Sequence, residues 1–419
     1  MRLLHVVHRY LPRYLAGTEV YTAALAGGLR ERGHTLQIFT GDPEAAAPER
    51  YEWDGIGVQA VPWGGGRAAG PAGTFLAGFR NPAAERAFRA ALDTFRPDLV
   101  HVQHGLGLSP WLAAQARGWG AAVVITLHDF WWACSNTWLF RYTGQLCPGP
   151  GIGYHCGGCA LQRLGRGPNA VLMAATTPVF AARTRVLRRA LLAGQLLIAP
   201  SQIVADTYQR LGIPAERLRL VRHGLAPASG TVSPPAGRPG RGPRFLYLGS
   251  LLRSKGPQVV LEAFAGLGAL GAELRLHGDA PADPAYAADL ARLAAQPGVS
   301  LGGRLTRAEV SAALQDADVL VLPSLWPETH AIVVDEAFAA GRPVVVSAGS
   351  AAAERVRDGV DGLTAPPGDV AAWQRQLRRL VDEPGLLAHL RAGVQPPATL
   401  AEHVDRIEAL YTEALAGRR

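Results

Sequence analysis

The stretch "PSLWPETHAIVVDEAFAAGRPVVVS" (residues 323–347) decides the fold. An apolar run leads into it and predicts a buried strand, and the periodicity that follows predicts a helix from about Thr329 to Ala340. Gly341 and Pro343 stop that helix before a second apolar run begins. Strand, helix and strand in this order form the unit from which parallel sheets are built.

The same alternation of β-branched apolar runs and helical patterns extends along the whole chain. Continuous apolar runs that are joined through helices are typical of buried parallel sheets. The sequence therefore predicts two doubly wound parallel-sheet α/β domains, whose ligands bind at the carboxyl ends of the strands, in a central cleft between the domains. The predicted strands are 2–8, 35–40, 98–104, 122–129, 196–201 and 218–224, then 244–250, 273–278, 318–324 and 343–347.

A Pro-, Gly- and Ser-rich stretch separates the two series of strands and predicts a linker over 226–243. The first domain is then 1–225, with a cysteine-containing insertion at 130–168, and the second is 244–398. The final segment, 399–419, predicts an amphipathic helix that packs back on the first domain.

The composition is that of a globular protein, with 48% hydrophobic and 18% charged residues in 419. A net charge of +8 suits anionic partners, but the charge is spread along the chain, which weakens a nucleic-acid interpretation. The chain shows neither a secretory signal pattern nor a long apolar span. We expect a cytoplasmic protein that can lie at the inner face of a membrane.

Lys255 is the only lysine among 42 lysine and arginine residues. It lies in "SLLRSKGP" (250–257), between the end of a predicted strand and Pro257, which suits the first position of a helix. Free amide groups and the helix dipole gather at such a place and favour an anion. A lysine is a compact cation on a flexible stem, so Lys255 is interpreted as a phosphate ligand rather than an ordinary surface lysine.

Two glutamates lie near the start of the predicted helix after the second domain's third strand. Glu328 and Glu336 are eight residues apart, so both can point toward one pocket, where carboxylates can accept hydrogen bonds from sugar hydroxyls. The amides of residues 329–333 add a second anion site. Alone, the two glutamates are better explained as a favourable first-turn charge at Glu328 and a solvated face at Glu336.

Together these motifs resemble the signature of glycosyltransferase family 4, the retaining nucleotide-sugar enzymes of the GT-B fold. The resemblance rests on the two glutamates within "PS…PE…EAFAAGRPVV…S" and on four further segments in the same order. These are "GTEVYTAALAGGLRERGH" (17–34), "TLHDFWWAC" (126–134), "LYLGSLLRSKG" (246–256) and "RVRDGVDGLTAPPGD" (355–369).

The resemblance implies a donor site for a UDP- or GDP-sugar and a glycan or lipid-linked acceptor. Lys255 would hold the diphosphate, Glu336 the ribose, and Glu328 the donor sugar; Gly17 would approach the diphosphate, and His128 the transferred sugar. The other implied donor contacts are Gly249, Ser250, Thr329, His330, Ala331, Ile332 and Val333.

Two positions depart from the family pattern. The family usually has an arginine where this chain has Ser250, and Arg253 is the nearest replacement. Ala331 stands where a glycine is frequent in the sugar-binding turn. Because the resemblance supplies no nucleophilic carboxylate, it implies front-side attack, in which the leaving diphosphate takes the acceptor's proton without a metal ion.

All four cysteines lie within the insertion: Cys134, Cys147, Cys156 and Cys159. A cytoplasmic chain should not hold disulfides, so the cluster suggests a structural zinc site, an iron–sulfur cluster, or four unrelated thiols. Farther on, the basic helix predicted over 179–194 could lie on an anionic membrane or pack as an ordinary surface helix.

Three functions are weighed. The first is a retaining hexosyltransferase in cell-surface polysaccharide or glycolipid synthesis. The second is a nucleotide-sugar 2-epimerase of the same architecture, which the paired glutamates oppose. The third is a basic nucleic-acid-binding protein, which would not need those glutamates.

Overall fold

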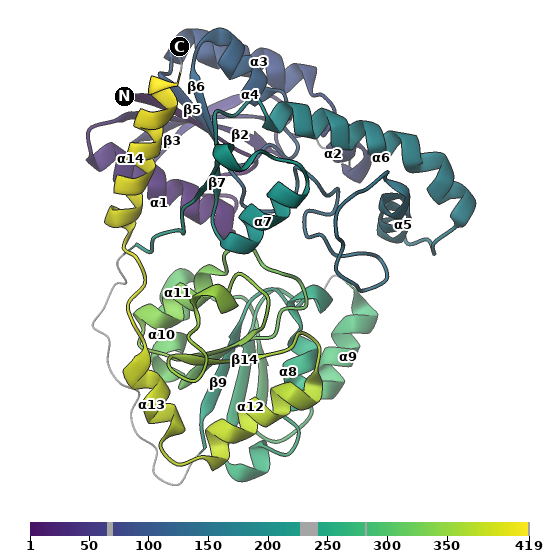
Figure 1. Cartoon of the computed structure of the whole chain (residues 1–419), viewed down its shortest axis with the longest axis vertical. Helices are drawn as coiled ribbons and strands as arrows, with labels where there is room; N and C mark the ends of the chain where they lie inside the picture. The colour runs from purple at the N-terminus through teal and green to yellow at the C-terminus, as the bar shows by residue number, and fades with distance from the viewer. Residues whose placement is uncertain (65–69, 227–241, 281–282, 418–419) are drawn as a thin grey trace. The chain divides into compact units, whose positions relative to one another are not determined.

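The computed structural model describes residues 1–64, 70–226, 242–280 and 283–417 (Figure 1). Contacts divide the chain into two compact units, one of residues 1–224 with 400–419 and the other of residues 225–399. The linker predicted over 226–243 falls almost entirely on residues outside the described ranges.

The first unit is built on an eight-stranded sheet in the order β3-β4-β2-β1-β5-β6-β7-β8. Its strands pair in parallel except for β3, which runs antiparallel to β4. The strands are β1 (Arg2–Val7), β2 (Thr35–Asp42), β3 (Glu49–Trp53), β4 (Ile56–Pro62), β5 (Leu99–Val102), β6 (Ala122–Thr126), β7 (Leu196–Ala199) and β8 (Leu218–Leu220).

Helices cover both faces of this sheet, and the last helix of the chain is one of them (Figure 1). Ile407 and Tyr411 of that helix are fully buried in the same core as Leu25 and Leu29 of the first helix. The helices are α1 (Gly17–Glu31), α2 (Gly70–Ala77), α3 (Pro82–Phe95), α4 (Leu112–Trp119), α5 (Tyr154–Arg163), α6 (Ala170–Leu191), α7 (Gln202–Arg210), the short 3-10 turn Ala215–Arg217, and α14 (Leu400–Ala416).

The second unit has an all-parallel six-stranded sheet in the order β11-β10-β9-β12-β13-β14. Its strands are β9 (Arg244–Leu248), β10 (Glu273–His277), β11 (Val299–Gly302), β12 (Val319–Leu322), β13 (Val344–Ser347) and β14 (Gly362–Ala365). Its helices are α8 (Pro257–Ala263), α9 (Pro284–Ala294), α10 (Arg307–Asp316), α11 (Ile332–Ala339), α12 (Val370–Asp382) and α13 (Leu386–Gly393), with 3-10 turns at Arg253–Lys255, Gly268–Leu270 and Ala353–Arg355.

The predicted fold class, two doubly wound parallel-sheet domains, is confirmed. Each predicted strand is present, and most end a few residues earlier than expected, because the last residues already belong to the loops at the sheet edge. Four strands were missed: β3, β4, β11 and β14. The β3–β4 hairpin has a signal in the sequence, since its turn is Asp54-Gly55 with both residues at positive φ.

Each sheet has a point where the strand order reverses. In the first unit β1 lies between β2 and β5, and in the second β9 lies between β10 and β12. Loops that leave the carboxyl ends of these neighbouring strands in opposite directions create a crevice, which is the usual binding place in such sheets. Gly17, Lys255 and Glu328 follow strands at these two points, and His128 follows β6, the neighbour of β5.

No helix in the described part of the chain has the length and apolar content that crossing a bilayer requires.

Candidate active site

Lys255 and Glu328 form an ion pair at the switch point of the second unit. Lys255 follows β9 and Glu328 follows β12, the neighbouring strand in the sheet. The ammonium nitrogen donates to both carboxylate oxygens of Glu328, at 2.8 and 2.9 Å, and lies 4.9 Å from the centre of the Trp326 ring. The sequence analysis assigned both residues to the nucleotide-sugar site but did not predict that they form an ion pair with each other.

The Glu328 carboxylate is buried and surrounded by donors. Only 4% of the residue is exposed. Besides Lys255, two other groups donate to Oε1 of Glu328. They are the Ser324 hydroxyl and the indole N–H of Trp326, the latter at 3.0 Å. A buried carboxylate with this many donors is held in one orientation, and it fixes the direction in which the Lys255 ammonium points.

The helix α11 begins at Ile332, so the prediction that it begins at about Thr329 was wrong. The reason is local: Ala331 adopts a left-handed conformation, with φ of 60°, which interrupts helical geometry just before Ile332. The first amides of α11, those of Ile332 and Val333, have no intrahelical acceptor, as at any helix start. The predicted amide site is therefore shorter than expected.

Arg355 and Asp335, which the sequence analysis did not name, hold the turn before α11 together with His330, which it did. Arg355 donates to the Asp335 carboxylate at 2.7 Å and to the Ala331 carbonyl at 2.8 Å. His330 Nε2 lies 2.8 Å from the same Asp335 oxygen, and both acid and imidazole are buried. Arg355 opens "RVRDGVDGL", one of the segments that carry the family resemblance, but nothing in the sequence indicated its partner.

Glu336 lies one turn into α11 and is partly buried. No hydrogen bond to its carboxylate is formed by any residue in the described ranges. Burial raises the pKa of this carboxyl above its usual value, with Arg307 opposing and Asp335 adding to the rise. A partly desolvated carboxylate without a hydrogen bond is suited to accept one from a ligand hydroxyl.

The loop between β9 and α8 needs glycine at position 256. Gly256 has φ of 73°, and a side-chain carbon there would lie 2.0 Å from the Pro323 carbonyl oxygen. The close approach seats the Lys255 turn against the end of β12. Gly249 and Ser250 lie at the start of this loop, where the Gly249 amide bonds to the His277 carbonyl and the Ser250 carbonyl accepts from Tyr247.

Arg253 is not brought to the Lys255–Glu328 pair. Its guanidinium stacks on Tyr286 of α9, 4.2 Å from the ring centre, and lies 3.6 Å from Asp289. The side chain is more than half exposed. Its interpretation as a replacement for the family's arginine stays a prediction.

In the first unit, imidazoles and acids gather at the carboxyl ends of β1 and β5. Gly17 is the first residue of α1, and Glu19, in the same turn, lies 3.4 Å from His8. His8 packs on His104, whose Nε2 lies 3.0 Å from Asp129. Burial raises the pKa of Glu19 and lowers that of His8, so desolvation drives both toward their neutral forms despite their proximity.

His128 follows β6 and is held by a buried hydrogen-bond chain. Its Nε2 lies 2.8 Å from the side-chain oxygen Oε1 of Gln103, and the side-chain nitrogen Nε2 of Gln103 lies 3.1 Å from His101 Nδ1. His101 also bonds to Thr126 and to Tyr411 of the C-terminal helix. This arrangement orients the imidazole of His128. Of the residues in this hydrogen-bonded series, the sequence analysis named only His128.

Comparison with known proteins identifies both halves of the chain. Residues 16–224 match a family model described as "Glycosyl transferase 4-like domain", and residues 242–383 match "Glycosyl transferases group 1". The D-inositol 3-phosphate glycosyltransferase 1 of Catenulispora acidiphila is 28% identical over 96% of this chain and 92% of its own length. The 2-deoxystreptamine glucosyltransferase of Streptomyces kanamyceticus is 30% identical over 50% of this chain and 51% of its own length.

Solved structures agree on the fold. Sucrose-phosphate synthase from Thermosynechococcus elongatus aligns over 99% of both chains with a TM-score of 0.72 at 19% identity. Anabaena HepE, in its complex with UDP-glucose, aligns over the full length of both chains with a TM-score of 0.63 at 17% identity. These likenesses confirm the GT-B fold.

Proposed function

This chain belongs to glycosyltransferase family 4, and we propose that it moves a hexose from a nucleotide-diphosphate sugar to a glycan or lipid-linked acceptor with retention of configuration. The observation that carries the proposal is the Lys255–Glu328 pair at the switch point of the second sheet. Family membership favours the transferase over the epimerase and the nucleic-acid-binding protein.

The diphosphate is proposed to bind between Lys255 and the start of α11. Two of the three ammonium hydrogens of Lys255 are directed to Glu328, which leaves one for a phosphate oxygen. The amides of Ile332 and Val333 add the positive end of a helix dipole. Together these groups can stabilise charge on the leaving diphosphate, so we propose that transfer itself needs no metal ion.

The other roles follow the chemistry of each side chain. Glu336 is proposed to accept hydrogen bonds from the nucleotide ribose. The turn at Gly17 is proposed to approach the diphosphate, and His128 the transferred sugar. Bond breaking then proceeds from the front face: the acceptor oxygen bonds to the anomeric carbon as the bond to the diphosphate breaks, and the diphosphate oxygen takes the acceptor's proton.

The acceptor and the location of the reaction are proposed from one observation each. Two relatives act, by their names, on D-inositol 3-phosphate and 2-deoxystreptamine, so a small cyclitol is a second candidate acceptor. Contact with an anionic membrane, from a cytoplasmic location, is supported by three exposed arginines of α6, Arg185, Arg188 and Arg189.

A panel of UDP- and GDP-hexoses tests the function, first without acceptor and then with lipid-linked glycans or inositol phosphate. We expect release of nucleoside diphosphate with one donor and an axial product linkage, detected by NMR of the anomeric proton. Inversion of configuration would contradict the mechanism. Conversion of the donor into its 2-epimer would replace the transferase with the isomerase.

A further inference from the structure

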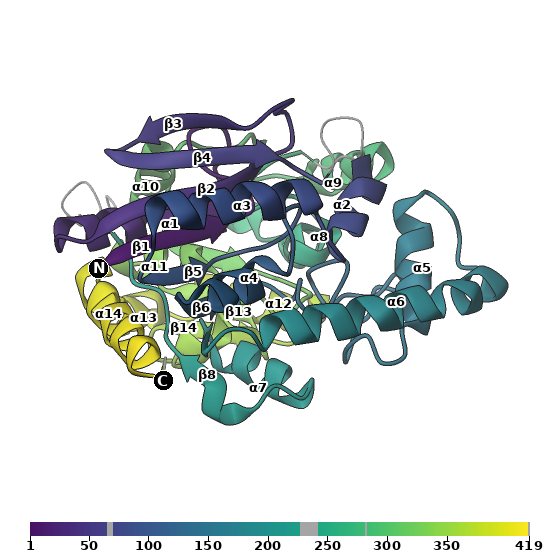
Figure 2. The same cartoon turned by 90° about the horizontal axis from the view of Figure 1, so that it is seen from above.

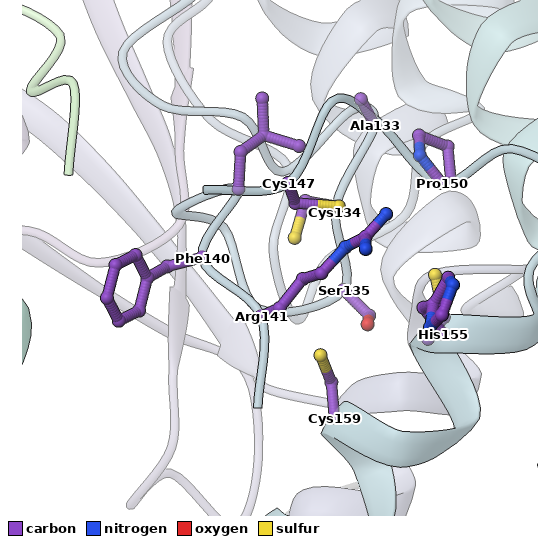
Figure 3. A pocket seen from close by; sticks show the side chains of 11 residues that line it. Ala133, Cys134, Ser135, Phe140, Arg141, Cys147, Pro150, His155 and Cys159 are labelled. Atoms are coloured by element: carbon purple, nitrogen blue, oxygen red, sulfur yellow. The ribbon is translucent and has the colours of Figure 1, made fainter. Parts of the chain in front are cut away.

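The four cysteines of the insertion converge on one cavity. Cys134 lies in the turn that follows β6, Cys147 closes a small hairpin, and Cys156 and Cys159 lie one helical turn apart on α5. Figure 3 shows Cys134 and Cys147 close together, with Cys159 pointing toward them from α5. Three separate segments of the chain thus bring all four of its cysteines to the wall of one cavity.

Hydrogen bonds hold the backbone around Cys134 and Cys147 in place. The Cys134 amide bonds to the Phe130 carbonyl at 2.6 Å, and the amide of Asn136 donates to Cys134 Sγ at 3.4 Å. The Cys147 amide bonds to the Leu139 carbonyl at 2.7 Å, across the hairpin. An amide that donates to sulfur two residues earlier stabilises negative charge on that sulfur.

Glycine lets helix α5 approach the hairpin. A side-chain carbon on Gly158, between the two cysteines of α5, would lie 2.3 Å from the ring of Tyr142. Helices α5 and α6 lie side by side in both views (Figures 1 and 2) and are in contact. The close packing holds Cys156 and Cys159 against the loop that carries the other two thiols.

The cavity suits a single small ion. Its volume of ≈ 20 Å³ exceeds the roughly 10–15 Å³ that one water molecule needs, so the cavity has room for one small ion. The walls between the sulfurs include Ala133, Leu139 and Pro150, which offer no competing ligands, and His155 is the one imidazole at the rim.

A buried cation next to the cysteines lacks a carboxylate partner. Arg183 of α6 is 4% exposed and donates to the Trp131 carbonyl at 3.3 Å, while its Nε is buried without a hydrogen bond. Within the described ranges no carboxylate lies at salt-bridge distance from it. A divalent ion bound by four thiolates has a net charge of −2, which would balance this guanidinium and that of Arg141 at the cavity.

We propose that Cys134, Cys147, Cys156 and Cys159 bind one zinc ion as a structural tetrathiolate site. Binding replaces four S–H bonds with four Zn–S bonds and releases four protons to solvent. As the side chains lie, no three described His, Cys, Asp or Glu residues have metal-binding geometry, and Cys147 donates its S–H to the Gly149 carbonyl at 3.2 Å. The deprotonated sulfurs would turn inward about χ1 to reach the ion.

The site would organise the insertion and, through it, His128. The insertion directly follows His128 and Asp129. Asp129 accepts from the Trp131 amide at 2.7 Å and lies 3.0 Å from His104, so the first turn of the insertion is tied to the imidazoles at the sheet edge. Metal binding then acts as local folding energy for residues 130–168.

Elemental analysis of full-length protein purified without added metal tests the proposal. We expect about one zinc per chain. The double substitution Cys156→Ser and Cys159→Ser should abolish zinc binding, and His155→Ala should retain it as a matched control from the same cavity. Cobalt exchanged into the site should give the intense absorption of thiolate-to-metal charge transfer.

Limited proteolysis with trypsin supplies a second measurement. It uses wild-type protein, so it does not depend on whether the cysteine variants fold. Removal of zinc by a strong chelator from wild-type protein should expose Arg141 and Arg163 to cleavage, and added zinc should restore protection. Protein with no stoichiometric metal whose four thiols all react in the native state would overturn the proposal. So would iron with sulfide, a cysteine disulfide, or loss of zinc in His155→Ala. None of these readouts depends on transferase activity.

Discussion

At the scale of single residues, the site contains charged groups whose burial costs free energy and one residue whose left-handed backbone costs free energy for steric reasons. Lys255 is held by a carboxylate with only 4% exposure, Ala331 is held at positive φ, and Glu19 is an acid in a desolvated cluster. Each arrangement costs folding free energy, and each lies at a switch point of its sheet, where ligands of this fold class bind.

The contribution of the Lys255–Glu328 ion pair to stability can be measured apart from the proposed catalytic role of the lysine. Lys255→Ala should lower kcat by about 100-fold or more, because charge on the leaving diphosphate loses its cation. It should also lower the free energy of unfolding by about 2 kcal/mol, because it leaves Glu328 buried without its charged donor. Donor turnover and urea denaturation measure the two effects.

The double variant Lys255→Ala with Glu328→Gln distinguishes these effects. It should recover part of the lost stability but none of the lost turnover. Arg292→Ala, an exposed cation of the same unit, is the control and should change neither quantity. Near wild-type turnover in Lys255→Ala would remove the lysine from the mechanism.

Ala331→Gly should stabilise the second unit by about 1 kcal/mol, because glycine adopts φ of 60° without the steric cost that an alanine side chain carries. Thermal unfolding measures the change. Ala339→Gly, at the last residue of α11, is the matched control with helical backbone and should be destabilising instead, by up to about 1 kcal/mol. A loss of stability in Ala331→Gly would mean that contacts of the methyl group outweigh the strain.

Glu19→Gln should make the protein more stable at about pH 8, with a difference from wild type that shrinks toward about pH 5. Because burial raises the pKa of Glu19, the folded state favours the protonated acid, and stability is lost as pH rises through that raised value. Glutamine stays neutral throughout. Denaturation at several pH values tests this, with Glu31→Gln, an exposed acid of the same helix, as the control.

At the scale of elements, the second unit places its candidate ligands by loops that follow β9 and β12. The Lys255 loop fits against the end of β12 only because Gly256 has no side chain, and Arg355 ties the turn before α11 to Asp335. Position in these loops, rather than propensity, therefore determines which residues meet.

Gly256→Ala should lower both turnover and stability, the latter by about 2 kcal/mol or more. The new methyl group would lie 2.0 Å from the Pro323 carbonyl oxygen, so the loop that carries Lys255 must move. Gly303→Ala has no atom within 4 Å of the new carbon and should behave as wild type. Equal, small effects of the two substitutions would show that this loop tolerates displacement.

At the scale of the whole molecule, the chain leaves the first unit, forms the second, and returns. Helix α14 completes the core of the first unit, where Tyr411 bonds to His101 at 2.7 Å and His403 to Tyr21 at 2.8 Å. Tyr411 of the C-terminal helix α14 thus belongs to the series of hydrogen bonds that ends at His128.

Ile407→Ala should therefore destabilise the first unit, although it lies beyond the second unit in sequence. Ile407 is fully buried, and removal of such a side chain costs about 2–5 kcal/mol. Hydrogen exchange of amides in β1 and β5 should rise while amides in β9 and β12 keep their protection. Arg406→Ala, its exposed neighbour, should leave both sets unchanged.

The sequence by itself determined the fold class, because apolar runs of strand length joined by helical patterns can be buried only in parallel sheets. It also determined the candidates Lys255, Glu328 and Glu336, because each follows a strand end or lies near a helix start. It could not show that Lys255 pairs with Glu328, that α11 begins at Ile332, or that Arg355 and Gln103 support the site. Those facts depend on which strand ends become neighbours and on left-handed backbone at Ala331. Only the tertiary structure decides such contacts, because they join residues far apart in sequence through packing that no local pattern records.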